Sequence, residues 1–82
     1  MLDLPYSDQA LKQLEKLDTS MEERVLKTLE RSRIRPTSYA KKLVSSPYFR
    51  LRVGDYRVIV DIQHKEIIIL VIEVGYRKNV YE

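Results

Sequence analysis

Three arginines are spaced so that two neighbouring strands would carry them on one face of a sheet. Arg50 and Arg52 alternate with apolar residues, which is the pattern of a half-exposed strand, and Gly54 begins a two-residue turn signal. If this turn closes a hairpin, Arg52 lies directly opposite Arg57, with Arg50 one step further along on the same face. Like charges in opposite positions destabilise a sheet, usually by less than about 1 kcal/mol. The sequence therefore predicts a face that attracts an anion.

A phosphate group is the anion that suits these side chains best. Arginine forms planar, paired hydrogen bonds with phosphate oxygens, and the tail residues Arg77 and Lys78 would add two further cations. The alternative is a surface on which Asp61 or Glu73 neutralises the arginines, or from which the side chains extend into solvent. The number of cations favours the phosphate site.

Positive charge is concentrated in the second part of the chain. Residues 1–30 contain four Lys or Arg and seven Asp or Glu, a net charge of −3, whereas residues 31–82 contain eleven and five, a net charge of +6. The basic part is the expected contact for a polyanion. On charge alone, an ordinary solvated surface of mixed sign is an equal alternative.

The composition excludes several kinds of site. Without cysteine there is no disulfide, thiolate nucleophile or cysteine zinc site, and the single histidine, His64, cannot build a metal cluster. A metal could bind only through carboxylates, and we expect neither a metal nor a cofactor. The longest apolar run, residues 67–72, is far shorter than the roughly 20 residues that span a bilayer. We therefore expect a cytoplasmic protein without membrane contact.

The elements that must position these residues begin with two helices. The 82 residues, 44% of them hydrophobic, suffice for one small core, so we expect a single domain over residues 1–82. Ser7 can cap a first helix, and Thr19 with Glu22 forms a capping box for a second. The second helix should end near Ile34, because Pro36 disfavours helical geometry at Arg35.

Strands follow the helices. Residues 37–47 are expected to form a linker with a helical turn near positions 39–43. Alternation and turn signals predict strands over residues 49–53, 56–63 and 66–74. The last is so uniformly aliphatic that both faces should be buried, as in a central strand. A first short strand over residues 2–6 contains a proline and should lie at an edge or barely pair. This order predicts an α+β fold: a small, twisted, antiparallel-rich sheet with an N-terminal two-helix hairpin on one face.

Two motifs carry a resemblance to a known family. Residues 48–59 read YFRLRVGDYRVI, and residues 74–81 read VGYRKNVY after an aliphatic strand. Together they resemble the RelE/ParE superfamily of bacterial and archaeal toxins, and they look closer to its RelE side. The leading helices and the segment around Leu43 fit as well, so the resemblance covers nearly the whole chain. It implies a RelE-like microbial RNase fold.

The resemblance also implies a function. RelE-type proteins are toxins of type II toxin–antitoxin systems, bind a cognate antitoxin of the RelB kind and, when free, enter the ribosomal A site and cut the messenger RNA there. The implied activity is a ribosome-dependent endoribonuclease that inhibits translation without a metal ion. The implied partners are the antitoxin, the ribosome with messenger RNA in its A site, and ribosomal RNA.

Particular residues match functional positions of the family. Arg57 matches the arginine of the "YR" strand, Arg77 the arginine after the "VG" pair, and Tyr81 the tyrosine near the C-terminus; these positions are catalytic in the ribosome-dependent nucleases. Arg50 falls where such nucleases often have a catalytic lysine, and Tyr48 at another position that can be lysine. Arg50 keeps the positive charge, but its high pKa makes it a poor proton donor or acceptor.

Further residues are expected to contact RNA rather than to react. Tyr48 could stack on a base or simply frame the sheet. Lys41 and Lys42 form a solvated face that could touch ribosomal RNA phosphates. The expected RNA-binding set is Arg52, Tyr48, Lys78, Lys41 and Lys42.

The chemistry sets requirements that this composition meets only in part. When an RNA 2′-hydroxyl attacks its own 3′-phosphate, the reaction needs in-line geometry, a proton acceptor, donors for the phosphorane charge and a proton for the 5′-oxygen. Arginines supply the charge stabilisation. For proton transfer the candidates are Tyr81 and the arginines, and a tyrosine with an ordinary pKa of about 10 is a poor base unless cations lower that pKa. Such a site must rely on an aligned substrate, which predicts dependence on the ribosome.

Two other functions remain open on the sequence. A gyrase-directed toxin of the same fold would inhibit by binding and would have no nuclease chemistry. A plain nucleic-acid-binding domain would use the basic sheet without cutting. The set of Arg57, Arg77 and Tyr81 argues against the first alternative.

Overall fold

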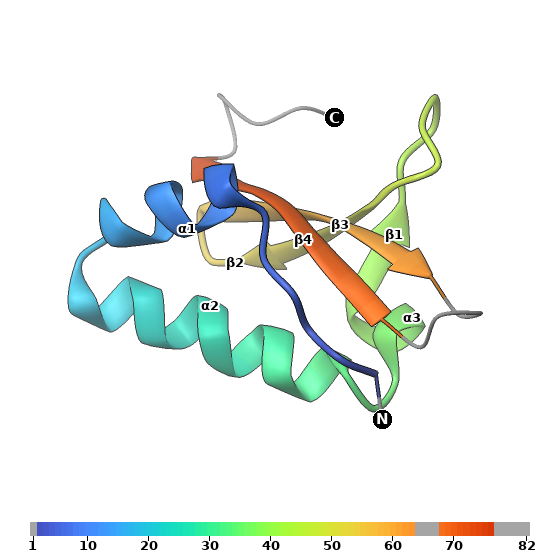
Figure 1. The fold of residues 1–82 in the computed structure, drawn as a ribbon, viewed down its shortest axis with the longest axis horizontal. Coiled ribbons are helices and arrows are strands. Elements are labelled where there is room, and N and C mark those ends of the chain that lie inside the picture. Colours follow the sequence, from blue (N-terminus) through green and yellow to red (C-terminus); the bar gives the residue numbers. More distant parts are fainter. Residues whose placement is uncertain (1, 64–67, 77–82) are drawn as a thin grey trace.

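The computed structural model describes residues 2–63 and 68–76, which form three helices and four strands (Figure 1). The elements in chain order are α1 (Asp8–Glu15), α2 (Thr19–Ser32), α3 (Pro36–Tyr39), β1 (Ala40–Lys42), β2 (Phe49–Val53), β3 (Tyr56–Gln63) and β4 (Ile68–Tyr76). Among these residues, no helix is long and apolar enough to cross a membrane.

The two long helices begin at capped positions. Ser7 caps α1, as predicted: its Oγ accepts a hydrogen bond of 3.0 Å from the backbone N–H of Ala10. The prediction that Thr19 caps α2 is wrong, because Asp18 Oδ1 accepts from the N–H of Met21 at 2.8 Å and Thr19 is already helical. Aspartate one residue earlier offers the stronger cap.

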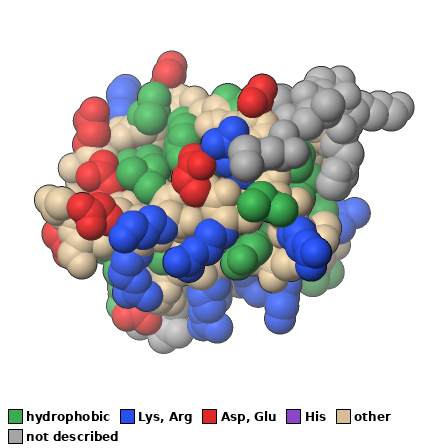
Figure 2. Space-filling view, turned by 90° about the horizontal axis from the view of Figure 1, so that it is seen from below, with side chains coloured by type: hydrophobic (Ala, Val, Ile, Leu, Met, Phe, Trp, Pro, Cys, Tyr) green, Lys and Arg blue, Asp and Glu red, His purple; other side chains and the backbone are tan. Residues whose placement is uncertain are grey.

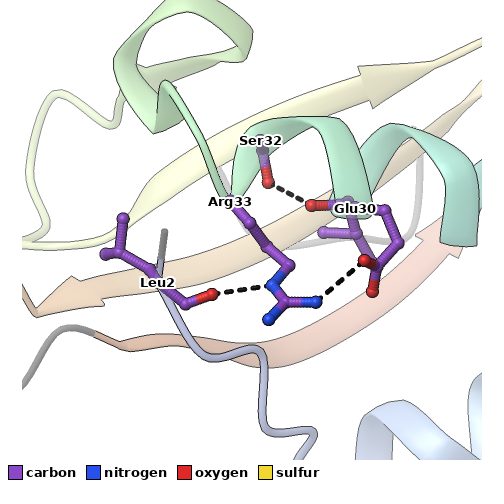
Figure 3. A network of polar contacts seen from close by, with 5 residues as sticks. Leu2, Glu30, Ser32 and Arg33 are labelled. Atoms are coloured by element: carbon purple, nitrogen blue, oxygen red, sulfur yellow. Dashed lines mark hydrogen bonds and ion pairs between the residues drawn. The ribbon is translucent and has the colours of Figure 1, made fainter.

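The end of α2 is tied to the start of the chain (Figure 3). Arg33 donates from Nε to the backbone oxygen of Leu2 at 2.7 Å and from Nη1 to Glu30 Oε1 at 2.9 Å, while the N–H of Leu2 donates to the oxygen of Arg33 at 3.0 Å. The hydroxyl of buried Ser32 donates a hydrogen bond of 2.6 Å to the backbone oxygen of Leu29. One arginine thus fixes the N-terminal segment against α2.

The strands form one antiparallel sheet in the order β1-β2-β3-β4. The α+β prediction is confirmed, but the prediction that the aliphatic strand is central is wrong, because β4 lies at the end of this order. The expected first strand reduces to isolated bridge positions at Asp3 and Tyr6, of which Tyr6 pairs in parallel with Val71. It barely pairs, as its proline suggested.

An edge strand can be this apolar because other parts of the chain cover its outer edge. The oxygen of Val71 accepts from the N–H of Ser7 at 2.8 Å, and its own N–H donates to Pro5 at 2.9 Å. Further along, Gln13 of α1 accepts from the N–H of Val74 at 2.5 Å. Backbone groups of Val71 and Val74 that an edge strand would otherwise expose are therefore satisfied.

The segment after α2 differs from the predicted linker. The helical turn expected near positions 39–43 is wrongly placed: the turn is α3, which begins at Pro36 because proline has a φ suited to the first helical position and needs no N–H there. Residues 40–42 then form β1, where the sequence predicts a linker, and pair with β2. Three residues are too few for an alternation signal.

The sheet has two different faces. Helices α1 and α2 pack on one of them, and the main core lies between: it contains Ala10, Leu14, Val25 and Leu29 from the helices and Leu51, Val53, Val58, Val60, Val71 and Val74 from the strands. Among the described residues, the opposite face bears a small apolar cluster in which Leu43 and Ile59 are buried and Tyr48 packs against them. The candidate site lies on this second face.

Candidate nucleic-acid interface

The β2–β3 hairpin has the predicted register. Val53 pairs with Tyr56, and Arg52 pairs directly with Arg57. Gly54 closes the turn with a φ of 59°, a left-handed conformation that glycine adopts without strain. The predicted opposition of two arginines on one face of the sheet is therefore confirmed.

The neighbouring register positions add two more cations. Arg50 pairs with Ile59 of β3 on one side and with Lys41 of β1 on the other. Cβ atoms of directly opposed residues lie about 4.5–5.5 Å apart. Because residues two apart on a strand share a face, Arg50 and Lys41 lie on the same face as Arg52 and Arg57. Four cations from three strands are thus gathered there.

Arg57, like Arg50, is a partly buried arginine of this face, and its Nε and Nη1 atoms are shielded from solvent. On β4 it pairs with Gly75, which has no side chain to compete for the position. Arg52, by contrast, is exposed. Arg57 is therefore held at the base of the cationic face, where weaker screening by water strengthens its interaction with an anion.

An apolar floor supports these cations. Ile59 is 1% exposed and Leu43 6% exposed, and the half-buried Tyr48 packs against them. Tyr48 is fixed by its backbone: its N–H donates to Ser46 Oγ at 3.1 Å and its oxygen accepts from the N–H of Leu43 at 3.0 Å. Sequence analysis missed this floor, although the uninterrupted run of residues 58–60 signals burial on both faces.

The remaining predicted site residues stand apart from this group. Lys42 pairs with Phe49 and so belongs to the other face of the sheet. Arg77, Lys78 and Tyr81, as well as His64, lie outside the described residues. Asp61, one of the two carboxylates considered as a neutralising partner, accepts a hydrogen bond from Gln63 Nε2 at 2.7 Å.

The geometry suits phosphate binding and charge stabilisation. Guanidinium groups on adjacent strands can donate to oxygens of one phosphate or of neighbouring phosphates, and the rigid tyrosine beside them offers a stacking surface. In the described part of the chain, no three His, Cys, Asp or Glu side chains come together in a way that could hold a metal ion.

Comparison with known proteins assigns the family. The sequence profile described as the ParE toxin of the type II toxin–antitoxin system parDE matches residues 4–81. The chain belongs to the RelE/ParE toxin superfamily. No curated protein matches this toxin by sequence.

Solved toxin structures share its fold. The RelBE2 toxin–antitoxin complex from Mycobacterium tuberculosis superposes with a TM-score of 0.86 at 20% identity, covering 93% of this chain and 98% of that one. The intact E. coli RelBE complex gives 0.80 at 26% identity, covering 93% and 96%. The YoeB/ParE toxin from Agrobacterium tumefaciens gives 0.80 at 14% identity, covering 92% and 98%. The toxin fold inferred from the sequence motifs is thereby confirmed.

Proposed function

We propose that this toxin is an endoribonuclease that cleaves messenger RNA in the ribosomal A site, without a metal ion, and so inhibits translation in the cytoplasm. The observation that carries the proposal is the direct pairing of Arg52 with Arg57, with Arg50 and Lys41 in the adjacent positions. Cations gathered from three strands suit a chain of phosphates better than a single small anion.

Arg57 has the central role in the proposed reaction. The RNA 2′-oxygen attacks phosphorus, its proton passes to an acceptor, and the bond to the 5′-oxygen breaks as that oxygen takes up a proton. The products are a 2′,3′-cyclic phosphate and a 5′-hydroxyl end. Negative charge grows on the phosphorane between these events, and the partly buried guanidinium of Arg57 donates to its oxygens.

The other residues of the face position the RNA. Arg50 and Lys41 bind the phosphates that flank the reacting one. Exposed Arg52 binds the RNA strand at the point where the RNA leaves the β2–β3 hairpin. Tyr48 stacks on a base, since its ring is already held against the apolar floor and loses little freedom on binding.

Two residues enter the proposal through the family resemblance alone. Arg77 adds a second donor for the phosphorane charge, and the hydroxyl of Tyr81 takes part in proton transfer. Neither tyrosine nor arginine titrates near neutral pH, so most of the acceleration must come from alignment of the substrate. The ribosome provides this alignment by holding the codon close to in-line geometry.

The proposed protein partner is an antitoxin of the RelB kind. Several similar structures are complexes of RelE with RelB, at identities of 20–26%. A cationic sheet face is complementary to an acidic antitoxin segment, which would cover Arg50, Arg52 and Arg57. Saturation of the toxin with its antitoxin should then abolish cleavage, and a saturated complex that still cuts would refute this arrangement.

A second candidate function has its own support. The matching profile bears the name of ParE, and one similar structure is a YoeB/ParE toxin. A ParE-like toxin would inhibit gyrase by binding, with no RNA cleavage. The arginine pairing across β2 and β3 favours the nuclease, because guanidinium groups on adjacent strands can donate hydrogen bonds to the oxygens of the reacting phosphate.

Primer extension separates the two functions. Total RNA is isolated from cells shortly after toxin induction, and 5′ ends are mapped on several translated and untranslated messages. The nuclease predicts new ends in codon register on translated messages only, and their loss in Arg57→Ala. Purified toxin should leave gyrase supercoiling unaffected. Inhibited supercoiling without new RNA ends would establish the ParE-like function instead.

A further inference from the structure

A second cationic groove lies on the helical side of the hairpin. It is about 280 Å³ in volume and runs between α2 and the β2–β3 turn. Four residues of α2 and three of the hairpin line it: Arg24, Lys27, Thr28, Arg31, Arg52, Val53 and Gly54. Figure 2, which views the molecule from below α2, shows Lys and Arg side chains gathered over the middle of this side and Asp and Glu mostly toward one end.

Helical spacing builds one wall of the groove. Residues 24, 27, 28 and 31 follow the i, i+3, i+4, i+7 pattern of one helix face, while Val25 and Leu29 point into the core. Arg24 and Arg31 are seven residues apart, about 10.5 Å along the axis, which spans more than one phosphate. Lys27 and Arg31 are also like charges at i, i+4, an arrangement that destabilises a helix unless an anion is present.

These cations have no acidic partners in the part of the chain that is described. The ion pair found there joins Glu30 to Arg33. Arg24, Lys27 and Arg31 are exposed and form none with a described carboxylate. The groove therefore keeps its positive charge available for a ligand.

The turn gives the groove its shape. A Cβ atom at Gly54 would lie 3.4 Å from Arg24 Nη1 and 3.6 Å from Nη2, so the Arg24 guanidinium lies directly over the bare turn. Arg52 lines the groove and also belongs to the Arg57 face of the sheet. Arg52 thus belongs to both cationic surfaces, at the end of β2 that leads into the turn.

The lining favours a phosphate backbone over a protein segment. An amphipathic helix needs apolar surface, and the groove offers only Val53, which is itself buried. The adjacent hollow at the end of α2 is different: Ile34 and Tyr39 are exposed there among Arg31 and Arg35. Charge without apolar area is the character of a polyanion site.

We propose that this α2 groove binds the phosphate backbone of structured RNA and holds the toxin on the ribosome, separately from the cleavage site. The groove contacts two or more phosphates through Arg24, Lys27 and Arg31. Arg52 lies between this contact and the messenger RNA bound on the sheet face. The identity of that RNA as ribosomal rests on the proposed function; the binding of RNA by the groove does not.

The test compares variants of equal charge. Arg24→Ala/Arg31→Ala removes the two exposed cations at the ends of the groove. Lys12→Ala/Lys16→Ala is the control and removes two exposed cations of the α1 segment. Binding to a short RNA hairpin and to purified ribosomes is measured over a range of salt concentrations. The groove variant should bind both about tenfold or more weakly than the control, and its log–log salt slope should fall by about 0.9 for each lost phosphate contact.

Further arms separate the explanations. Arg24→Lys/Arg31→Lys should regain most of the affinity, because phosphate attraction depends mainly on charge. Cleavage at saturating ribosome concentration should match that of the wild type, since the groove does not touch the reacting phosphate. Unchanged melting temperatures would show that all variants fold.

Equal hairpin binding by the groove variant and the control would overturn the proposal. So would a groove variant that keeps its RNA affinity but loses binding to polyglutamate, which would assign the groove to an acidic protein segment. A wild-type toxin that binds RNA through the groove but never cuts messages would refute the proposed nuclease and leave the groove standing.

Discussion

The two faces of the same sheet have opposite characters. Along β2 and β3, alternate residues enter the helix-covered core, where Leu51, Val53 and Val58 are at most 4% exposed. The intervening residues, on the face opposite the helices, include Arg52 and Arg57. A strand period of two lets one hairpin stabilise the fold and present charge at the same time. Stability and activity should therefore separate by face, even between adjacent residues.

The largest expected effect is on the core face. Leu51→Ala should lower the free energy of unfolding by about 2–5 kcal/mol, because it leaves a cavity between the sheet and α2. Leu11→Ala is the matched control: Leu11 is 48% exposed, and its loss should cost less than about 1 kcal/mol. Urea denaturation measures both. Similar losses would mean that burial does not distinguish these positions.

The face opposite the helices should show the reverse behaviour. Arg57→Ala should reduce the cleavage rate on ribosomes by about 10²–10³-fold, because a donor to the phosphorane is lost. The same change should lower the free energy of unfolding by less than Leu51→Ala does, because Arg57 is only partly buried whereas Leu51 is 1% exposed. Exposed Arg35 provides the control, and Arg35→Ala should leave the rate close to that of the wild type. An Arg57→Ala variant with full activity would remove this residue from the site.

Arg33 sharpens the comparison, since it is an arginine with a structural task. Arg33→Ala removes the hydrogen bonds to Leu2 and Glu30 and should lower the free energy of unfolding by about 1.5–3 kcal/mol. Hydrogen exchange at the N–H of Val71, which the N-terminal segment protects, should accelerate. Cleavage at a temperature where the variant is folded should not change. Slowed cleavage in the folded variant would link the N-terminal segment to the site.

The smallest expected effect is a pH dependence on the helix side. Burial raises the pKa of Tyr6, and the Glu30 carboxylate raises it further while Arg33 opposes this. Because the folded-state pKa lies above the unfolded value of about 10, this group's stabilisation is present below pH 10 and is lost as the pH rises through the folded-state pKa. The alkaline decline in stability should be shallower in Tyr6→Phe than in the wild type. Identical declines would contradict this assignment.

The sequence predicts the hairpin better than the sheet around it. Local signals define a hairpin: alternation with a period of two and a Gly-Asp turn are enough to predict the pairing of Arg52 with Arg57. The position of β4 depends instead on distant contacts, because Pro5, Ser7 and Gln13 cover its edge. An aliphatic run indicates that other parts of the chain cover the strand. It does not indicate whether the covering element is another strand or a helix.

The same distinction applies to the site. The arginines on β2 and β3 are predictable because they are close in sequence. Lys41 is predicted as a solvated RNA contact, and its pairing with Arg50 depends on β1, whose three residues carry too little pattern to identify. The α2 groove combines a helix face with a turn more than twenty residues away, so only the folded chain brings Arg24 and Gly54 together.

Single-turnover cleavage of one RNA, free in solution and positioned in the ribosomal A site, tests the central claim most directly. Salt, RNA and excess toxin are matched in the two settings. The sheet face gathers cations but, in its described residues, no histidine, so the toxin should cut the ribosome-bound message and leave the free RNA essentially intact. Arg57→Ala should lose the ribosomal cut. Equal rates on free and bound RNA would contradict the account, because they would require a self-sufficient proton acceptor in the protein.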